Sequence, residues 1–126
     1  SAGIAVTTAM LSALTDRKIK AGIAMTGEVT LRGRVLPIGG LKEKTMAALR
    51  SGITTVLIPK DNVRDLEEID QTVRAALRFV PVETVDQVFA AALCLERDPI
   101  REEVADHVAA FAPAGRESGR DAAVRQ

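Results

Sequence analysis

Apolar and polar positions repeat with two different periods along most of the chain, and this predicts a mixed α/β fold. Residues 2–14 are apolar at nearly every position, as in a helix buried on several sides, and the polar run 15–18 ends it. Strands are expected at residues 23–31 and 35–38. The glycine-centred segment 32–34 lies between them and predicts a hairpin.

The pattern then alternates helices with strands. The expected elements are a helix at 41–50, a strand at 54–58, a helix from Asp61 to Ile69, a helical turn at 73–77, a strand at 79–82 and a helix from Thr84 to about Leu95. The continuous apolar run of the 54–58 strand is typical of burial on both faces. Thr84 and Gln87 have the spacing of a capping box. This order predicts an α/β domain with a mixed sheet flanked by helices.

The pattern changes after Arg97. Apolar residues recur at a spacing of three or four and predict one additional amphipathic helix over residues 97–112, through Ile100, Val104, Val108 and Phe111. Residues 113–126 are small, charged and glycine-bearing, which predicts a disordered tail. We therefore expect three parts, with the α/β domain at residues 1–96.

Composition excludes several classes of protein. The chain has 126 residues, 47% of them apolar, which suffices for one buried core. Seventeen basic residues balance seventeen acidic ones, and there is no Trp or Tyr, so a nucleic-acid surface is not expected. The single Cys94 favours the cytoplasm over an oxidising compartment. The apolar run 2–14 is too short to cross a bilayer, and no metal or cofactor site is predicted within the chain.

Three stretches of the sequence resemble the proteolytic domain of the Lon family of ATP-dependent serine proteases. They occur in the family's order and at its separations: SAG at residues 1–3, AMTGEVTLRGRVLPIGGLKEK at 24–44 and GITTVLIPKDNVRDLEEI at 52–69. The resemblance covers residues 1–95 and implies the Lon-type proteolytic domain fold. Because Ser1 is already part of the first motif, we expect this chain to be the C-terminal part of that domain, with the N-terminal part missing.

The resemblance also implies a catalytic site. In Lon-like proteases the serine of the SAG stretch is the nucleophile and the second lysine of LKEK is its partner, which implies a dyad of Ser1 and Lys44. The family uses the threonine of MTGE to hold the lysine amine, which implies a supporting role for Thr26. Glu28 lies in the same motif and is a further supporting candidate.

The chemistry of such a dyad is physically reasonable. A serine hydroxyl needs a base, and a lysine serves only when desolvation lowers the pKa of its amine from about 10.4. Free backbone N–H groups at a helix start can also stabilise an oxyanion. On a helix Lys44 shares an apolar face with Leu41 and Ala48, but Lys42 shares another with Met46 and Leu49. The pattern therefore leaves both lysines open, and the resemblance alone selects Lys44.

The resemblance implies an ATP-dependent endopeptidase that degrades unfolded, misfolded or regulatory proteins, including tagged ones, as a cytoplasmic hexameric ring. ATP and Mg²⁺ would bind to an ATPase module outside this chain, and the chain by itself is expected to be inactive. Two other classes stay open: an N-terminal-nucleophile hydrolase, in which the Ser1 α-amine is the base, and a non-catalytic ring-assembly domain of the same fold. In the simplest structural interpretation, Ser1 is a helix N-cap and Lys44 a surface lysine.

Overall fold

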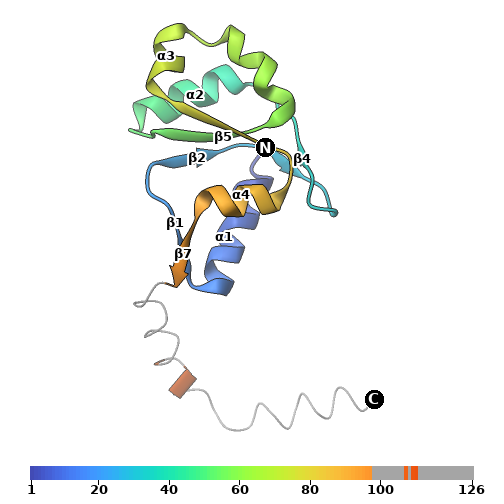
Figure 1. The fold of residues 1–126 in the computed structure, drawn as a ribbon, viewed down its shortest axis with the longest axis vertical. Coiled ribbons are helices and arrows are strands. Elements are labelled where there is room, and N and C mark those ends of the chain that lie inside the picture. The colour runs from blue at the N-terminus through green and yellow to red at the C-terminus, as the bar shows by residue number, and fades with distance from the viewer. Residues whose placement is uncertain (98–106, 108, 111–126) are drawn as a thin grey trace.

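A three-stranded parallel sheet with helices on both sides organises the fold (Figure 1). The computed structural model describes residues 1–97, 107, 109 and 110. The strand order is β2–β5–β6, with β2 at Ile23–Met25, β5 at Thr55–Pro59 and β6 at Arg78–Val82. The mixed α/β class is confirmed. The predicted helix at 97–112 lies almost entirely outside the described residues, and the predicted tail at 113–126 lies wholly outside them.

Two hydrophobic clusters lie on opposite faces of this sheet. Successive side chains of a strand point to opposite faces, so Val56 and Ile58 of β5 enter one cluster and Leu57 the other. The first cluster is covered by α2 (Leu41–Arg50), the 3₁₀ helix η1 (Lys60–Glu68) and α3 (Gln71–Ala76). The second is covered by α1 (Gly3–Thr15) and α4 (Val85–Ala92). The prediction that the β5 run is buried on both faces is therefore confirmed.

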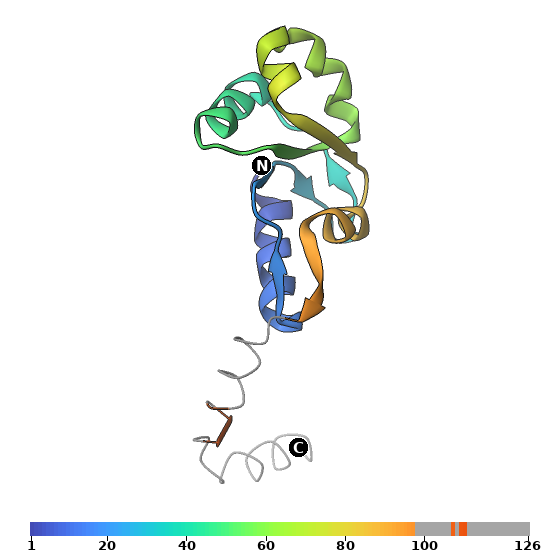
Figure 2. The same ribbon diagram turned by 60° about the vertical axis from the view of Figure 1, so that its left-hand side comes forward.

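Two antiparallel ladders complete the described fold. β3 (Glu28–Val29) pairs with β4 (Val35–Leu36), so the predicted hairpin is confirmed. Gly33 in its turn has φ +80°, a conformation that favours glycine. β1 (Arg17–Ile19) pairs with β7 (Leu93–Arg97), and Figure 2 shows both strands alongside α1. The antiparallel strands thus form their own ladders and leave the central sheet parallel.

Three predicted elements were wrong at their boundaries. The expected strand 23–31 is split into β2 and β3. Its first part pairs with β5 up to Thr26, and the chain then turns at Gly27 so that β3 pairs with β4. The expected polar turn 15–18 contains the start of β1, since Asp16 ends α1 in a left-handed conformation. The last helix ends at Ala92 rather than near Leu95, because the following residues pair with β1.

Two expectations about helices were also wrong. The element after β5 is a 3₁₀ helix, and Pro59 rather than Asp61 occupies its N-cap position. The α1 helix is buried along one face, through Ile4, Thr8 and Ser12, rather than on several sides, and Val6, Met10 and Leu14 are exposed. None of the described helices combines the length and apolarity needed to cross a membrane.

An exposed ion pair joins the residues that follow β5 and β6. Lys60 Nζ lies 2.6 Å from Glu83 Oε1. The hydrogen bond and charge of Glu83 raise the pKa of Lys60, and those of Lys60 lower the pKa of Glu83. The pKa of Glu83 is lower in the folded protein than in the unfolded chain, so the ionised carboxylate stabilises the fold at pH values above the ordinary pKa of 4.5. This contribution is lost as the pH falls through the lowered pKa. Solvent screening keeps the contribution small.

The predicted cap of α4 is present, and it supports a first prediction. Thr84 Oγ1 accepts a hydrogen bond from Gln87 N at 3.4 Å, and Gln87 Oε1 accepts one from Glu83 N at 2.7 Å. Thr84→Ala should weaken the first turn of α4 by about 1 kcal/mol, so its amides should exchange roughly five-fold faster. Hydrogen exchange measured by mass spectrometry on peptides covering α4 checks this. Unchanged exchange there would show that the cap contributes nothing.

Candidate active site

The Thr26–Gly27 turn connects the central sheet to the start of α1. Thr26 N donates to Leu57 O at 3.1 Å, which extends the pairing of β2 with β5 by one residue. Gly27 N then donates to Ser1 O at 2.9 Å, and Gly27 O accepts from Ile4 N at 3.1 Å. Two successive residues therefore hold the sheet on one side and the Ser1 backbone on the other.

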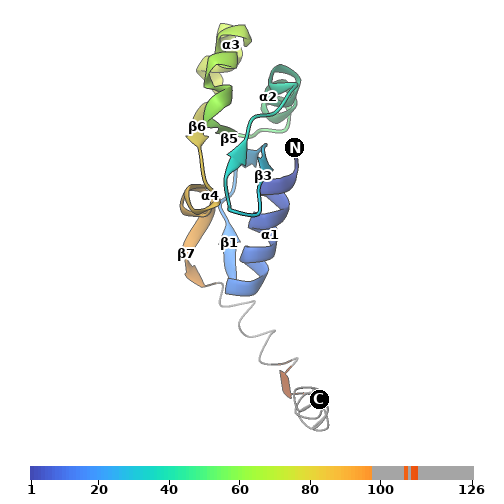
Figure 3. The ribbon, with the colours of Figure 1, turned by 90° about the vertical axis from the view of Figure 1, so that its right-hand side faces the viewer.

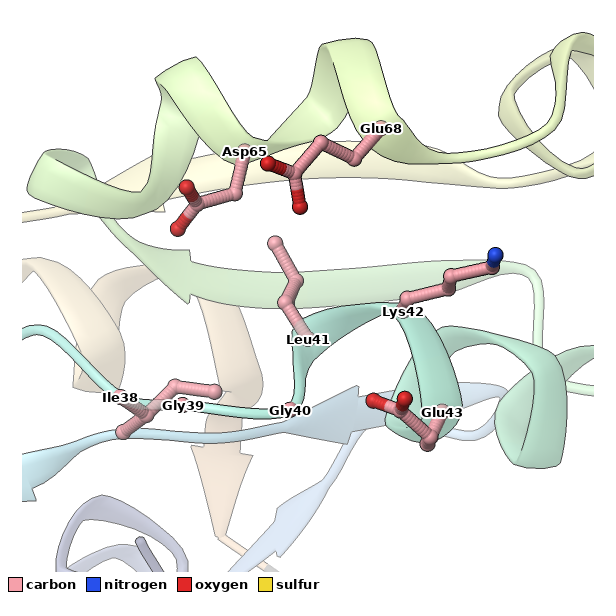
Figure 4. Close-up of a pocket in the computed structure, with 8 residues that line it drawn as sticks. All are labelled: Ile38, Gly39, Gly40, Leu41, Lys42, Glu43, Asp65 and Glu68. Atoms are coloured by element: carbon pink, nitrogen blue, oxygen red, sulfur yellow. The ribbon is translucent and has the colours of Figure 1, made fainter.

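Lys44 reaches the same turn from α2. Its Nζ donates to Thr26 Oγ1 at 3.2 Å, its side chain is half-buried, and Thr26 is 5% exposed. Lys42 is exposed and lines a separate cavity of about 350 Å³ at the start of α2 (Figure 4). The two lysines that the sequence pattern left open thus have different surroundings, and Lys44 is the one bonded to Thr26.

Ser1 lies at the end of α1 that faces α2, where the N-terminus is marked in Figure 3. Ala2 rather than Ser1 occupies the N-cap position of α1, and no side-chain cap bond is made there. The simple interpretation of Ser1 as a helix cap is therefore wrong. Glu28 Oε1 lies 3.8 Å from the Ser1 nitrogen, so Glu28 is on the Ser1 side of the turn and Thr26 on the Lys44 side.

Gly27 is a residue of this site that the sequence interpretation did not single out. A Cβ built on it would lie 2.9 Å from Val35 Cγ1 and 3.3 Å from Ile4 Cδ1, so the turn leaves no room for a side chain. The signal was available, because an isolated glycine within a strand pattern marks a bulge or a close backbone approach.

The residues joined by the Thr26–Gly27 turn carry the two kinds of group that acyl transfer uses, a hydroxyl and an amine. The Ser1 backbone carbonyl and the Lys44 amine are hydrogen-bonded to the same turn, and α1 begins two residues after Ser1 with its first backbone N–H groups. The Ile4 N–H group already donates to Gly27 O and is not free to bind an oxyanion. Within residues 1–97, 107, 109 and 110, no three or more His, Cys, Asp or Glu side chains are grouped to hold a metal ion.

Comparison with known proteins identifies the family. Residues 1–95 match the family model described as the Lon protease (S16) C-terminal proteolytic domain. The chain is 64% identical over 99 residues to Lon protease of Vibrio parahaemolyticus, covering 79% of this chain and 12% of that protein. It is 62% identical over 97 residues to Lon protease 1 of Myxococcus xanthus, covering 77% of this chain and 12% of that protein. It therefore spans about 12% of the length of these relatives. With this match, the chain belongs to the Lon protease (S16) C-terminal proteolytic domain family.

Proposed function

We propose that the protein is a serine endopeptidase in which Ser1 is the nucleophile and Lys44 the general base. The observation that carries this proposal is the Thr26–Gly27 turn, which bonds to the Lys44 amine through Thr26 Oγ1 and to the Ser1 carbonyl through Gly27 N. Family membership adds support, since the matched relatives are named Lon proteases.

The proposed reaction proceeds in two acyl-transfer steps. Ser1 Oγ attacks the scissile carbonyl carbon while its proton passes to the lone pair of Lys44 Nζ. Thr26 Oγ1 accepts one N–H of this amine, which leaves the lone pair free to face the serine. The protonated amine then returns the proton to the departing peptide nitrogen, and an acyl-enzyme remains. Water, activated by the same lysine, hydrolyses the ester and regenerates Ser1.

The activity of the whole protein is a wider proposal. We propose that ATP and Mg²⁺ act in an ATPase module outside this chain, which unfolds protein substrates and feeds them to the site. The substrates would be unfolded, misfolded or tagged proteins, the assembly a homohexameric ring and the compartment the cytoplasm. We expect the 126-residue chain alone not to cleave peptides, because it spans only about 12% of the length of its relatives.

A fluorophosphonate reagent tests the role of Ser1 in the full-length protein. The reagent should modify Ser1, as located by peptide mass spectrometry, because it reacts with activated serine hydroxyls. Ser1→Ala should remove this modification, and Lys42→Ala should leave it unchanged. Modification of a different serine, with Ser1 unreacted while peptides are cleaved, would contradict the assignment.

A comparison of two forms of the chain separates the dyad from the other two classes. An N-terminal-nucleophile hydrolase needs a free α-amine at Ser1, so it should be active when the chain begins at Ser1 and inactive when residues precede it. The proposed dyad predicts activity in the extended form. A ring-assembly domain predicts no cleavage and no Ser1 modification in either form.

A further inference from the structure

Asn62 forms hydrogen bonds to the backbone of a distant residue with both polar atoms of its side chain. It lies in η1, three residues after the end of β5, and is 2% exposed. Asn62 Oδ1 accepts from Ile38 N at 2.9 Å, and Asn62 Nδ2 donates to Ile38 O at 2.9 Å. Asn62 Nδ2 also donates to Asp65 Oδ2, with 2.7 Å between the nitrogen and the oxygen. The side-chain amide thus pairs with Ile38 much as a neighbouring strand would.

Two exposed glycines connect Ile38 to the first residue of α2. Gly39 and Gly40 are exposed, and a Cβ built on Gly39 would meet no atom within 4 Å. Gly40 has φ +73° and makes no side-chain cap to α2. Figure 4 shows this segment running along the cavity, opposite Asp65 and Glu68 of η1. The attachment at Ile38, together with the burial of Leu41 in the first hydrophobic cluster, therefore fixes where α2 begins.

The beginning of α2 in turn determines where the Lys44 amine lies. Lys44 N donates to Gly40 O at 3.2 Å, so the lysine lies in the first turn of the helix. Its amine must meet Thr26, which is tied to β5 by the bond to Leu57 O. Asn62 follows the same strand. The Lys44 amine is therefore positioned relative to β5 through Thr26, and the start of the helix that carries Lys44 is positioned relative to β5 through Asn62.

We propose that Asn62 is a positioning residue for the peptidase reaction, holding the start of α2 so that the Lys44 amine stays on Thr26. This inference rests on the proposed function. This role requires an uncharged amide, because the Ile38 N–H group needs an acceptor and the Ile38 carbonyl needs a donor.

Two substitutions change the hydrogen bonds between residue 62 and Ile38 in different ways. Asn62→Ala removes both hydrogen bonds to Ile38 and frees the α2 start. Asn62→Asp keeps the size but places a carboxylate oxygen against Ile38 O and Asp65, where neither can donate. When the pH falls and the new carboxyl group binds a proton, it regains a donor. Burial and the neighbouring Asp65 charge favour that proton.

The expected result in the full-length protein is a loss of turnover with substrate binding retained. Asn62→Ala should lower kcat for a short peptide by about ten- to a hundred-fold, because small misplacements of catalytic groups have effects of this size. KM should stay within about two-fold, and fluorophosphonate modification of Ser1 should slow in parallel with kcat. The ratio of Asn62→Asp activity to wild-type activity should rise as the pH is lowered from 8 to 6.

Thr84→Ala is the matched control, because it also removes a side-chain bond to the backbone, but at α4. It should keep wild-type kcat. Normal kcat in a folded Asn62→Ala protein would overturn the proposal, as would an Asn62→Asp ratio that stays constant with pH. If Asn62→Ala does not fold, the proposal is tested by the pH dependence of the Asn62→Asp to wild-type activity ratio alone. Ser1→Ala is measured in parallel, since cleavage that survives in it would refute the proposed function rather than the role of Asn62.

Discussion

Replacing Lys44 with alanine should abolish peptide cleavage, with a fall in kcat/KM of about 10²–10⁴-fold. A positioned general base contributes a factor of this size, and Lys44 Nζ is the amine that bonds to Thr26 Oγ1 in the Thr26–Gly27 turn. Cleavage of a short fluorogenic peptide by the full-length protein provides the measurement. A short peptide needs no unfolding, so the assay reports the chemical site.

Lys42→Ala is the matched control because it removes the same kind of side chain from the same helix. Lys42 is exposed, and the activity of this variant should stay within a few-fold of wild type. Ser1→Ala should be as inactive as Lys44→Ala, and the double variant no worse than either, since the two groups act as a unit. Cleavage retained in Lys44→Ala and lost in Lys42→Ala would show that the proposal assigns the base to the wrong lysine.

Gly27→Ala should damage both stability and activity. Its Cβ would lie 2.9 Å from Val35 Cγ1, and Val35 is buried and cannot move freely. Crowding of this kind costs about 1–3 kcal/mol. The backbone must shift to relieve it, and this shift would disturb the hydrogen bond from Gly27 N to Ser1 O. We expect a lower unfolding midpoint in urea and a fall in kcat of at least about ten-fold.

Gly39→Ala is the control for stability, since its Cβ would have open space. Its unfolding midpoint should match or exceed that of the wild-type protein, because alanine restricts the unfolded chain more than glycine does. A Gly27→Ala protein with unchanged midpoint and unchanged kcat would show that the turn relaxes without cost.

Local patterns predicted the elements that bury a continuous or periodic apolar set. The run at β5 and the amphipathic helix α2 are examples, because their burial follows from neighbouring residues alone. β1 was missed because its three residues are all exposed and are defined by pairing with β7, more than 70 positions away. A pattern read over a short window carries no information about such a partner.

The sequence identified some of the candidate site residues but not all of them. The motif resemblance named Ser1, Lys44, Thr26 and Glu28, and the Thr26–Lys44 hydrogen bond joins two of them across 18 positions. Asn62 and Gly27 stood within the quoted stretches without an assigned role. Their roles depend on which backbone passes beside them, Ile38 for Asn62 and Ser1 for Gly27. That information exists only once the strands have been placed.

The reliance of the site on β5 has a consequence for synthesis. Among these residues, Ser1, Thr26 and Lys44 leave the ribosome before Leu57 and Asn62, which bond to the turn and to the segment before α2. A parallel strand pair also forms slowly, because its partners are far apart along the chain. During translation the hydroxyl and the amine therefore stay unaligned until β5 and η1 have emerged. The proposed peptidase site would therefore be completed only after most of the described fold has been made.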